Sequence, residues 1–227
     1  MLTPAEVMAM STVPTQVTAE LFRYLIEHST PEDPFLRQVR EAALAAELPA
    51  IWISPEQAVF MGILLQISGA RKVLEIGTLG GYSAIAMAQA MGPQGHVDTL
   101  EIEPTHATFA REWISKGNFE SRIEVHLGAA LDTLPGLAGK APYDAVFIDA
   151  DKGNYASYLD RTLDMVKDGG LVMVDNAFAF GRILEAQTTT DDVWAIRAFN
   201  DLMAREKRVT SQIVPVADGL WVGVKHS

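Results

Sequence analysis

The stretch KVLEIGTLGGYSA, from Lys72 to Ala84, determines the fold class of this 227-residue chain. It reads as a short apolar strand, a glycine-containing turn and the start of a helix. Further apolar runs follow at 95–102, 122–128, 143–150 and 169–176, and helical stretches separate them. Strands that alternate with helices predict right-handed crossovers and a parallel sheet covered on both faces.

The two ends of the chain extend this α/β architecture. Helical spacing of apolar residues predicts helices over 15–28, 35–48, 55–68, 82–91, 104–116, 129–134, 155–166 and 191–206. Pro135 is expected to end the short helix 129–134. Near the C-terminus, two apolar runs flank Ala217-Asp218-Gly219, which is a hairpin-turn pattern. We therefore expect one domain over 1–227, with a helical N-terminal extension over 1–70, five parallel strands and a terminal antiparallel hairpin.

Composition argues against several classes of protein. The net charge of −11 disfavours a nucleic-acid partner, which would need clustered Lys and Arg. The absence of cysteine removes disulfides, thiolate nucleophiles and cysteine zinc sites, and the five histidines have no ligand-like spacing. No apolar run approaches the length of a membrane span. We expect a cytoplasmic protein without a membrane partner.

The loop Gly77-Thr78-Leu79-Gly80-Gly81, called the glycine loop below, departs from the dinucleotide-binding pattern. Leu79 stands where Gly-x-Gly-x-x-Gly has its middle glycine, so phosphates are poorly accommodated. Glu75 would repel phosphate but can accept hydrogen bonds from an ammonium group. Glu101, 24 positions after Gly77, has the spacing of an acid that binds ribose hydroxyls. A ribose, a cationic amino-acid tail and no phosphate indicate S-adenosylmethionine; the alternative is an ordinary strand-turn-helix with an exposed Glu101.

Acidic residues end two of the predicted strands. Asp149 ends the fourth strand and Asp175 the fifth, and Asn176 follows. Because the carboxyl ends of parallel strands share one edge, these groups should face the same crevice as the glycine loop. Their oxygens suit a hard divalent cation, Mg²⁺ first, with Mn²⁺ or Ca²⁺ as alternatives. Lys152 is then placed to act as general base, whereas the alternative is a solvated lysine at a helix start.

Five motifs in this order carry a family resemblance: LEIGTLGGYSAIAMA, LEIEP, FIDADKGNY, VDN and PVADGL. Over roughly 54–224 they resemble the cation-dependent O-methyltransferases, namely the caffeoyl-CoA O-methyltransferase group and its bacterial relatives, with catechol O-methyltransferase more distant. The resemblance implies a Rossmann-like class I methyltransferase with a mostly parallel seven-stranded sheet. It also implies a homodimer that transfers a methyl group from S-adenosylmethionine to a hydroxyl of an ortho-dihydroxy aromatic, or catechol-type, acceptor.

The resemblance also assigns the site residues. The cofactor contacts would be Ile53, Glu75, Gly77, Thr78, Ser83, Glu101, Ala130 and Asp149. The metal ligands would be Asp149, Asp175 and Asn176, and the catalytic residues Lys152 and Asp149. Ile53 is a departure, since plant relatives often carry threonine there, and 177–182 replaces a tryptophan-bearing segment. The roles of Asp151, Phe178 and Phe180, the aromatic acceptor and the methylated hydroxyl stay open.

Three other functions compete with this one. An NAD(P)-type oxidoreductase on a similar sheet would conflict with Leu79 and would leave the Asp-Asp-Asn set unexplained. A non-catalytic S-adenosylmethionine-binding protein would have no need of Lys152 and the three oxygen ligands. A nucleic-acid methyltransferase is disfavoured by the acidic balance and by the lack of an Asn-Pro-Pro-Tyr-like motif.

Overall fold

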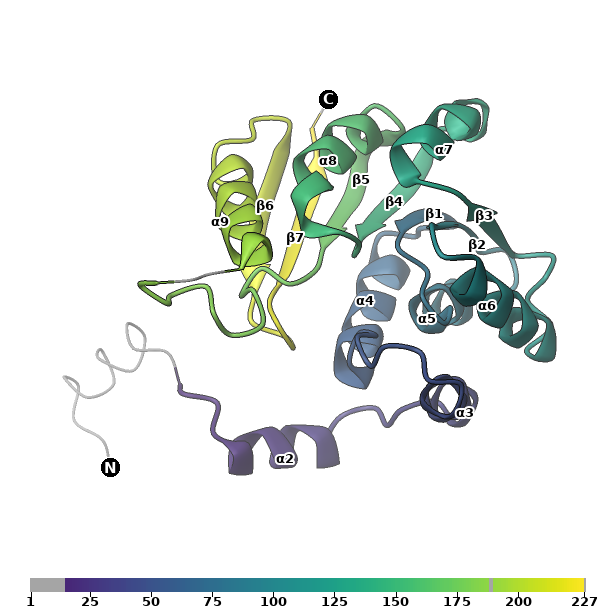
Figure 1. Cartoon of the computed structure of the whole chain (residues 1–227), viewed down its shortest axis with the longest axis horizontal. Coiled ribbons are helices and arrows are strands. Elements are labelled where there is room, and N and C mark those ends of the chain that lie inside the picture. The colour runs from purple at the N-terminus through teal and green to yellow at the C-terminus, as the bar shows by residue number, and fades with distance from the viewer. Residues whose placement is uncertain (1–14, 188–189, 227) are drawn as a thin grey trace. The chain divides into compact units, whose positions relative to one another are not determined.

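The structure is a computed structural model that describes residues 15–187 and 190–226 (Figure 1). The chain divides into two compact units, residues 1–31 and 32–227. In the first unit, helix α2 (Ala19–Glu27) begins after Thr18, whose hydroxyl accepts a hydrogen bond from the Leu21 backbone N–H. The predicted helix 15–28 is therefore confirmed in a shorter form. The assignment of 1–227 to a single domain stays a prediction.

The second unit is built on a seven-stranded sheet with the order β3-β2-β1-β4-β5-β7-β6. The strands are β1 (Lys72–Ile76), β2 (His96–Glu101), β3 (Ile123–Leu127), β4 (Tyr143–Ile148), β5 (Val166–Val174), β6 (Val209–Val214) and β7 (Leu220–Lys225). Strands β1 to β5 pair in parallel, and β7 pairs antiparallel with both β5 and β6. The predicted fold class is confirmed, including the antiparallel pair at the end.

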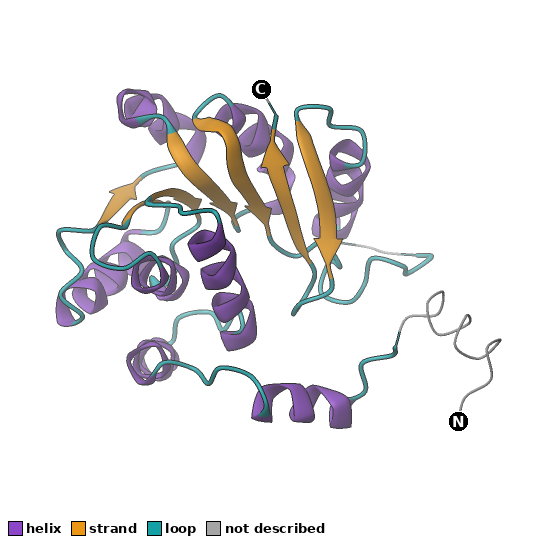
Figure 2. Ribbon diagram, turned by 180° about the vertical axis from the view of Figure 1, so that it is seen from behind, coloured by secondary structure: helices purple, strands orange, loops and turns teal. Residues whose placement is uncertain are grey.

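Helices cover both faces of this sheet, as Figure 2 shows. They are α3 (Pro34–Ala45), α4 (Pro55–Ile67), α5 (Tyr82–Ala90), α6 (Pro104–Lys116), α7 (Ala130–Leu137), α8 (Tyr155–Leu163) and α9 (Asp191–Met203), with short 3₁₀ turns η1 (Ala138–Lys140) and η2 (Lys152–Asn154). Helix α4 begins as its sequence predicts, with Pro55 in the first turn and the Ser54 hydroxyl accepting from the Gln57 backbone N–H. Among the described residues, no helix has the length and apolar character needed to cross a bilayer.

The element boundaries at Pro135 and between α8 and β5 differ from the prediction for reasons that the packing shows. Helix α7 continues through Pro135 to Leu137. Proline removes one hydrogen bond of the turn, but Leu134 and Leu137 are both buried, so packing holds the last turn in place. Helix α8 ends at Leu163 and β5 already begins at Val166, because Val166 pairs with Tyr143 ahead of a register irregularity.

The alternation of side chains along the central strands builds two cores. On one face, Val73 of β1 and Phe147 of β4 pack in a cluster with helices α3 to α6. On the other face, Leu74 and Val146 pack in a cluster with residues of α7, α8 and α9. Burial on both faces explains why these strands are almost continuously apolar in sequence.

The strand register determines what lies at the carboxyl edge of the sheet. Ile76 pairs with Leu100 of β2 and with Ile148 of β4, and Ile148 pairs with Val174 of β5. The residues that follow these positions therefore leave the sheet side by side. They include Gly77, the first glycine of the loop, and the acidic residues Asp149 and Asp175.

Candidate active site

A cavity of about 890 Å³ opens at the carboxyl edge of the sheet. Its size is that of a small-molecule site. The predicted site residues that line it are Ile53, Gly77, Thr78, Ser83, Glu101, Ala130, Asp149, Lys152 and Asn176. Glu75 and Asp175 are not among the lining residues and are buried, with 0% and 5% of the residue exposed.

The glycine loop crosses the end of β4 at very short range. Gly77 has a φ of 100°, and a Cβ at this position would lie 1.9 Å from the Asp149 backbone oxygen. Only glycine has both the conformational freedom and the missing side chain that this crossing needs. The loop then enters α5 directly, so its backbone forms one wall of the cavity.

Glu101 holds the loop in this position. Its Oε2 accepts a hydrogen bond from the Leu79 backbone N–H at 2.6 Å, and its Oε1 accepts one from the Glu103 N–H at 2.9 Å. Leu79 has a φ of 48°, a left-handed conformation that this hydrogen bond helps to hold. Glu101 is buried rather than exposed, so the alternative of an ordinary strand-turn-helix with an exposed acid is wrong.

Glu75 lies beneath the loop in a chain of hydrogen bonds. The Thr99 hydroxyl donates to Glu75 Oε2 at 2.6 Å, and the Thr78 and Thr99 hydroxyls share a hydrogen bond of 2.6 Å. Burial raises the pKa of Glu75 to about 8, and the negative charges of Asp149 and Glu101 act in the same direction. Its Oε1 has no hydrogen-bond partner within the described residues, so it is available to a cationic donor.

Asp149, Asp175 and Asn176 are brought together as the sequence predicts. Burial first, and then the negative charge of Asp149, raise the pKa of Asp175 to about 7. The Asn176 backbone N–H donates to Asp175 Oδ1 at 2.8 Å, and the Asn176 side chain borders the cavity. Two carboxylates that repel each other beside an amide side chain match the donor chemistry of a hard divalent cation.

Lys152 points into this group. Its Nζ donates hydrogen bonds to Asp149 Oδ1 at 2.9 Å and to the Tyr155 hydroxyl at 2.6 Å. Only 10% of the Lys152 side chain is exposed, so the alternative of a solvated lysine is wrong. The ammonium is held within reach of whatever occupies the cavity.

Comparison with known proteins agrees with this geometry. Residues 26–226 match the O-methyltransferase family. The chain belongs to this family. It is 46% identical to a catechol O-methyltransferase from Mycobacterium tuberculosis over 166 residues, covering 73% of this chain and 75% of that protein. It is 34% identical to a catechol O-methyltransferase from Niastella koreensis over 213 residues, covering 93% and 94% of the two chains.

A solved structure supports the same assignment. The O-methyltransferase from Bacillus cereus, in complex with SAH, superposes with a TM-score of 0.82 at 37% identity, covering 89% of this chain and 96% of that one. The predicted enzyme class, an S-adenosylmethionine-dependent O-methyltransferase, is therefore confirmed.

The structure gives different surroundings to Asp151, Phe178 and Phe180, whose roles the sequence left open. Asp151 accepts hydrogen bonds from Asn154 Nδ2 at 2.5 Å and from the Tyr158 hydroxyl, so in this O-methyltransferase it holds the start of α8. Phe180 is 54% exposed and borders the cavity. Phe178 instead packs on Gly219, where a Cβ would lie 2.8 Å from its ring.

Three residues of the site were missed by sequence reasoning. Thr99 pairs in register with Glu75, a neighbour relation that only the strand alignment reveals. Tyr155 lies within the FIDADKGNY motif, and its spacing from Lys152 was a usable signal. Gln57 of α4 is 1% exposed, and its amide lowers the pKa of Asp175, but nothing in the sequence links these two positions.

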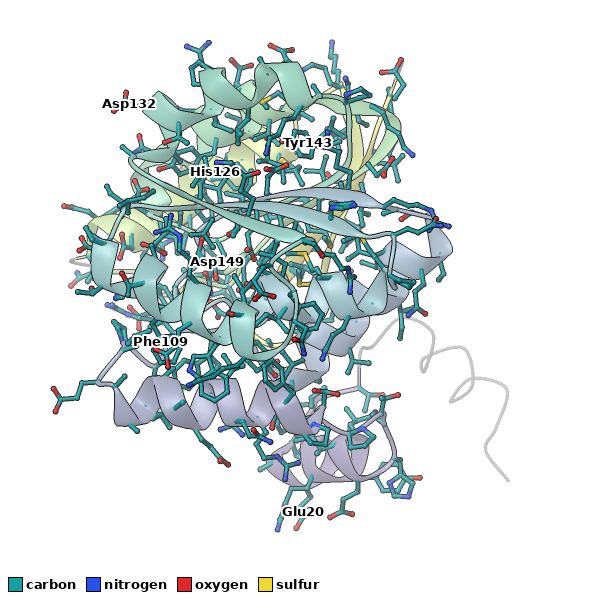
Figure 3. All side chains as sticks on the ribbon, turned by 90° about the vertical axis from the view of Figure 1, so that its right-hand side faces the viewer. Glu20, Phe109, His126, Asp132, Tyr143 and Asp149 are labelled. Carbon is teal, nitrogen blue, oxygen red and sulfur yellow. The ribbon has the colours of Figure 1, made fainter. Side chains whose placement is uncertain are left out.

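A second cluster of potential metal ligands lies elsewhere in this O-methyltransferase. Single ligand atoms of Asp98, Glu124 and His126 lie within 4.8 Å of one another. The Lys140 ammonium donates to Asp98 and Glu124, so a cation already occupies the cluster. In Figure 3, Tyr143, which donates to Asp98 at 3.0 Å, and Asp149 are labelled on either side of the strands. This cluster is therefore a charge network separate from the candidate active site.

Proposed function

We propose that this O-methyltransferase transfers the methyl group of S-adenosylmethionine to one hydroxyl of an ortho-dihydroxy aromatic, with the help of a divalent cation. The observation that carries the proposal is the convergence of Asp149, Asp175 and Asn176 beside Lys152, at the cavity that the glycine loop also borders. Two relatives are named catechol O-methyltransferases, which supports an acceptor of this type.

The cofactor side of the cavity fits S-adenosylmethionine. Each carboxylate oxygen of Glu101 accepts a backbone hydrogen bond and still has a lone pair that can accept one from a ribose hydroxyl. The Glu75 Oε1, which has no hydrogen-bond partner among the described residues, can accept one from the cofactor's ammonium group. The Thr78 hydroxyl hydrogen-bonds the Thr99 hydroxyl, so Thr78 would contact the cofactor through its backbone. The remaining proposed contacts, Ile53, Gly77, Ser83, Ala130 and Asp149, border the same cavity.

The cation side of the cavity supplies the rest of the chemistry. Asp149, Asp175 and Asn176 would hold the ion, with Mg²⁺ as the first candidate by its preference for oxygen ligands. When bound, the ion acts as a Lewis acid that stabilises the acceptor as a phenolate and orients it.

Lys152 takes the acceptor's hydroxyl proton in this proposal. Its neutral form acts as general base, and Asp149 and Tyr155 hold its Nζ in place. The phenolate oxygen then forms a bond to the methyl carbon while the carbon–sulfur bond breaks. The products are the methyl ether and S-adenosylhomocysteine, and the proton stays on the Lys152 amine until it passes to solvent.

The charge of the cavity favours a small acceptor without phosphates. The acidic residues that line it are Glu101, Glu103, Asp149, Asp151 and Asp192. Its lining Arg and Lys residues are Arg40 and Lys152, and each already hydrogen-bonds a carboxylate, on Glu32 at 3.0 Å and on Asp149 at 2.9 Å. A CoA thioester carries several phosphate charges that this lining would repel.

The other functions are less well supported. Membership of the O-methyltransferase family disfavours an NAD(P)-type oxidoreductase. The buried contacts of Lys152 disfavour a non-catalytic cofactor-binding protein. We further propose a cytoplasmic homodimer, on the family resemblance and the lack of cysteine; a sedimentation experiment that finds only monomer would contradict the dimer.

A methyl-transfer assay read by mass spectrometry tests the proposal. The wild-type protein receives S-adenosylmethionine and a panel of ortho-dihydroxy aromatics, with Mg²⁺ in one arm and EDTA in the other. We expect addition of one methyl group in the Mg²⁺ arm alone. Asp175→Ala should abolish transfer while it leaves cofactor binding, measured by calorimetry, nearly intact.

Two further variants complete the assay. Lys152→Ala should lower turnover more than cofactor affinity, because the base is lost and the cofactor contacts remain. Asp201→Asn, which alters an exposed carboxylate on α9, is the matched control and should behave as wild type. Equal methylation in EDTA would remove the metal from the proposal, and unchanged turnover of Lys152→Ala across pH would remove Lys152.

A further inference from the structure

The turn between β6 and β7 carries a carboxylate whose partners lie in the segment that follows Asp175. Asp218 Oδ2 accepts hydrogen bonds from Asn176 Nδ2 at 3.1 Å and from the Phe180 backbone N–H at 2.8 Å. Asp218 Oδ1 accepts one from the Gly181 backbone N–H at 3.1 Å. Arg182, the next residue, pairs with Glu185 at 3.0 Å instead. The Asp218 side chain is therefore committed to the active-site segment.

The contact with Asn176 determines which end of its amide faces the cavity. An ionised carboxylate only accepts hydrogen bonds, so Asn176 has to present its NH₂ group to Asp218. Within the described residues the Asn176 side chain hydrogen-bonds through its Nδ2, and the residue borders the cavity, so its Oδ1 is left for another ligand. Without Asp218, the amide could turn about its soft terminal torsion and present the NH₂ group to a cation.

The backbone around this contact is unusual. Asn176, Ala179 and Phe180 have φ values of 63°, 53° and 58°, in the left-handed region that residues other than glycine rarely adopt. Hydrogen bonds to the turn hold the segment: Ala177 N–H donates to the Gly219 carbonyl at 2.8 Å, and Phe178 N–H donates to the Asp218 carbonyl at 2.9 Å. Such conformations persist where surrounding contacts impose them.

We propose that Asp218 is a positioning residue for methyl transfer, which keeps the Asn176 amide oxygen directed at the cation and Phe180 in the cavity wall. The proposal rests on the proposed function, because it takes Asn176 as a metal ligand. Asp218 is not among the lining residues of the cavity and acts through Asn176 and the loop. Such outer partners of a metal ligand typically change metal affinity by about 10- to 100-fold when they are removed.

Titration with Mn²⁺ alone, read by electron paramagnetic resonance of the free ion, tests the proposal without catalysis. Asp218→Asn keeps the size of the side chain but replaces one acceptor oxygen by an NH₂ group. That group would face the three donors that Asp218 now accepts from, namely Asn176 Nδ2 and the N–H groups of Phe180 and Gly181. We expect Mn²⁺ affinity to fall at least about tenfold. In an Asn176→Ala background the same change should have less than about a threefold effect, because residues that act through one contact are not additive.

A reciprocal exchange distinguishes positioning from general stability. In the double variant Asn176→Asp, Asp218→Asn, the amide of residue 218 donates to the carboxylate of residue 176, which restores the side-chain contact with donor and acceptor exchanged. The amide oxygen of residue 218 keeps the Gly181 N–H, and only the Phe180 N–H loses its acceptor. Mn²⁺ affinity should return to within about threefold of wild type, and kcat should recover with it. Asp201→Asn serves as the control, and thermal unfolding is recorded for every variant.

The outcomes separate this proposal from the proposed function. If the wild-type protein binds no Mn²⁺, the metal-dependent function fails and this proposal fails with it. If wild type binds but Asp218→Asn binds equally well, only the positioning role is overturned. A loss of affinity by the same factor with and without the Asn176 amide would also overturn it. If Asp218→Asn does not fold, the reciprocal exchange decides: a folded variant without restored binding contradicts the proposal.

Discussion

Glu75 is the residue whose chemistry departs furthest from that of a surface acid. It is fully buried, hydrogen-bonds Thr99 through one oxygen and leaves the other without a partner among the described residues. Burial raises its pKa to about 8, so this group is largely protonated at neutral pH. A cationic ligand above it would favour the ionised form and would gain a charge-assisted hydrogen bond.

Replacement of this acid by its amide should stabilise the protein without ligand. Because the folded-state pKa is raised, the contribution of Glu75 to stability is full below about pH 4.5 and is lost as pH rises through about 8. Glu75→Gln stays neutral, so its advantage in unfolding free energy should grow over that interval, by at most about 1.4 kcal/mol per unit of pKa shift. Thermal unfolding between pH 4 and 9 measures this, with exposed Glu41→Gln as control.

The same substitution should weaken cofactor binding. The amide cannot form the ion pair with an ammonium group, so the affinity for S-adenosylmethionine, measured by calorimetry at pH 8, should fall while stability rises. A Glu75→Gln protein that unfolds at lower temperature than wild type at pH 8 would contradict the raised pKa. Unchanged cofactor affinity would remove Glu75 from the cofactor contacts.

At the scale of secondary structure, the connection from β1 through the glycine loop to α5 depends on the close approach of Gly77 to the end of β4. The loop passes the end of β4 so closely that the Gly77 position has no room for a side chain. Gly136 of α7 offers the opposite case, because a Cβ there would meet nothing within 4 Å. The two glycines therefore form a matched pair for a substitution by alanine.

Gly77→Ala should be strongly destabilising, and Gly136→Ala should not. The added Cβ at position 77 would overlap the Asp149 backbone oxygen, and the φ of 100° would be strained as well. We expect a loss of unfolding free energy above about 3 kcal/mol, or no folded protein, whereas alanine in the α7 helix should be neutral or stabilising by under about 1 kcal/mol. Urea denaturation measures the unfolding free energy of both variants. A Gly77→Ala variant as stable as wild type would contradict the close approach of the glycine loop to Asp149.

At the scale of the whole molecule, one edge of the sheet collects the chemistry of several distant segments. The ends of β1, β2, β4 and β5 meet there, and the β6–β7 turn supports them from the side. The cavity at this edge is lined by five carboxylates, and its lining Arg40 and Lys152 are each already paired with a carboxylate. The net charge of the whole chain is −11. The sign of the charge is thus the same in the site as in the whole protein.

This charge distribution predicts the order of acceptors. A neutral catechol should be methylated with higher kcat/KM than the CoA thioester of a related ortho-dihydroxy acid, by about tenfold or more at low salt, because the phosphates are repelled. Added salt should narrow the difference, since screening weakens the repulsion. Competition assays at two ionic strengths measure the ratio. A preference for the CoA thioester at low salt would contradict the prediction.

Much of the fold could be predicted from local sequence, because strand and helix periodicity and turn residues act over a few positions. The alternation of apolar strands and helices predicted the sheet, and Leu79 with Glu101 predicted the ligand class. The errors were local too: α7 passes through Pro135, and β5 begins at Val166, since packing and strand pairing outweighed the local signal.

The sequence by itself determined the fold class and the acidic residues that end its strands, because these follow from order and spacing along the chain, and its motifs carried the resemblance to the family. Only the tertiary structure decided how these residues are held. Lys152 lies between Asp149 and Tyr155, and Asp218 reaches Asn176 across 42 positions of sequence. The contacts of Lys152 span three positions each, but the Asp218–Asn176 contact depends on the register of strands and the packing of turns, so no local pattern can reveal it.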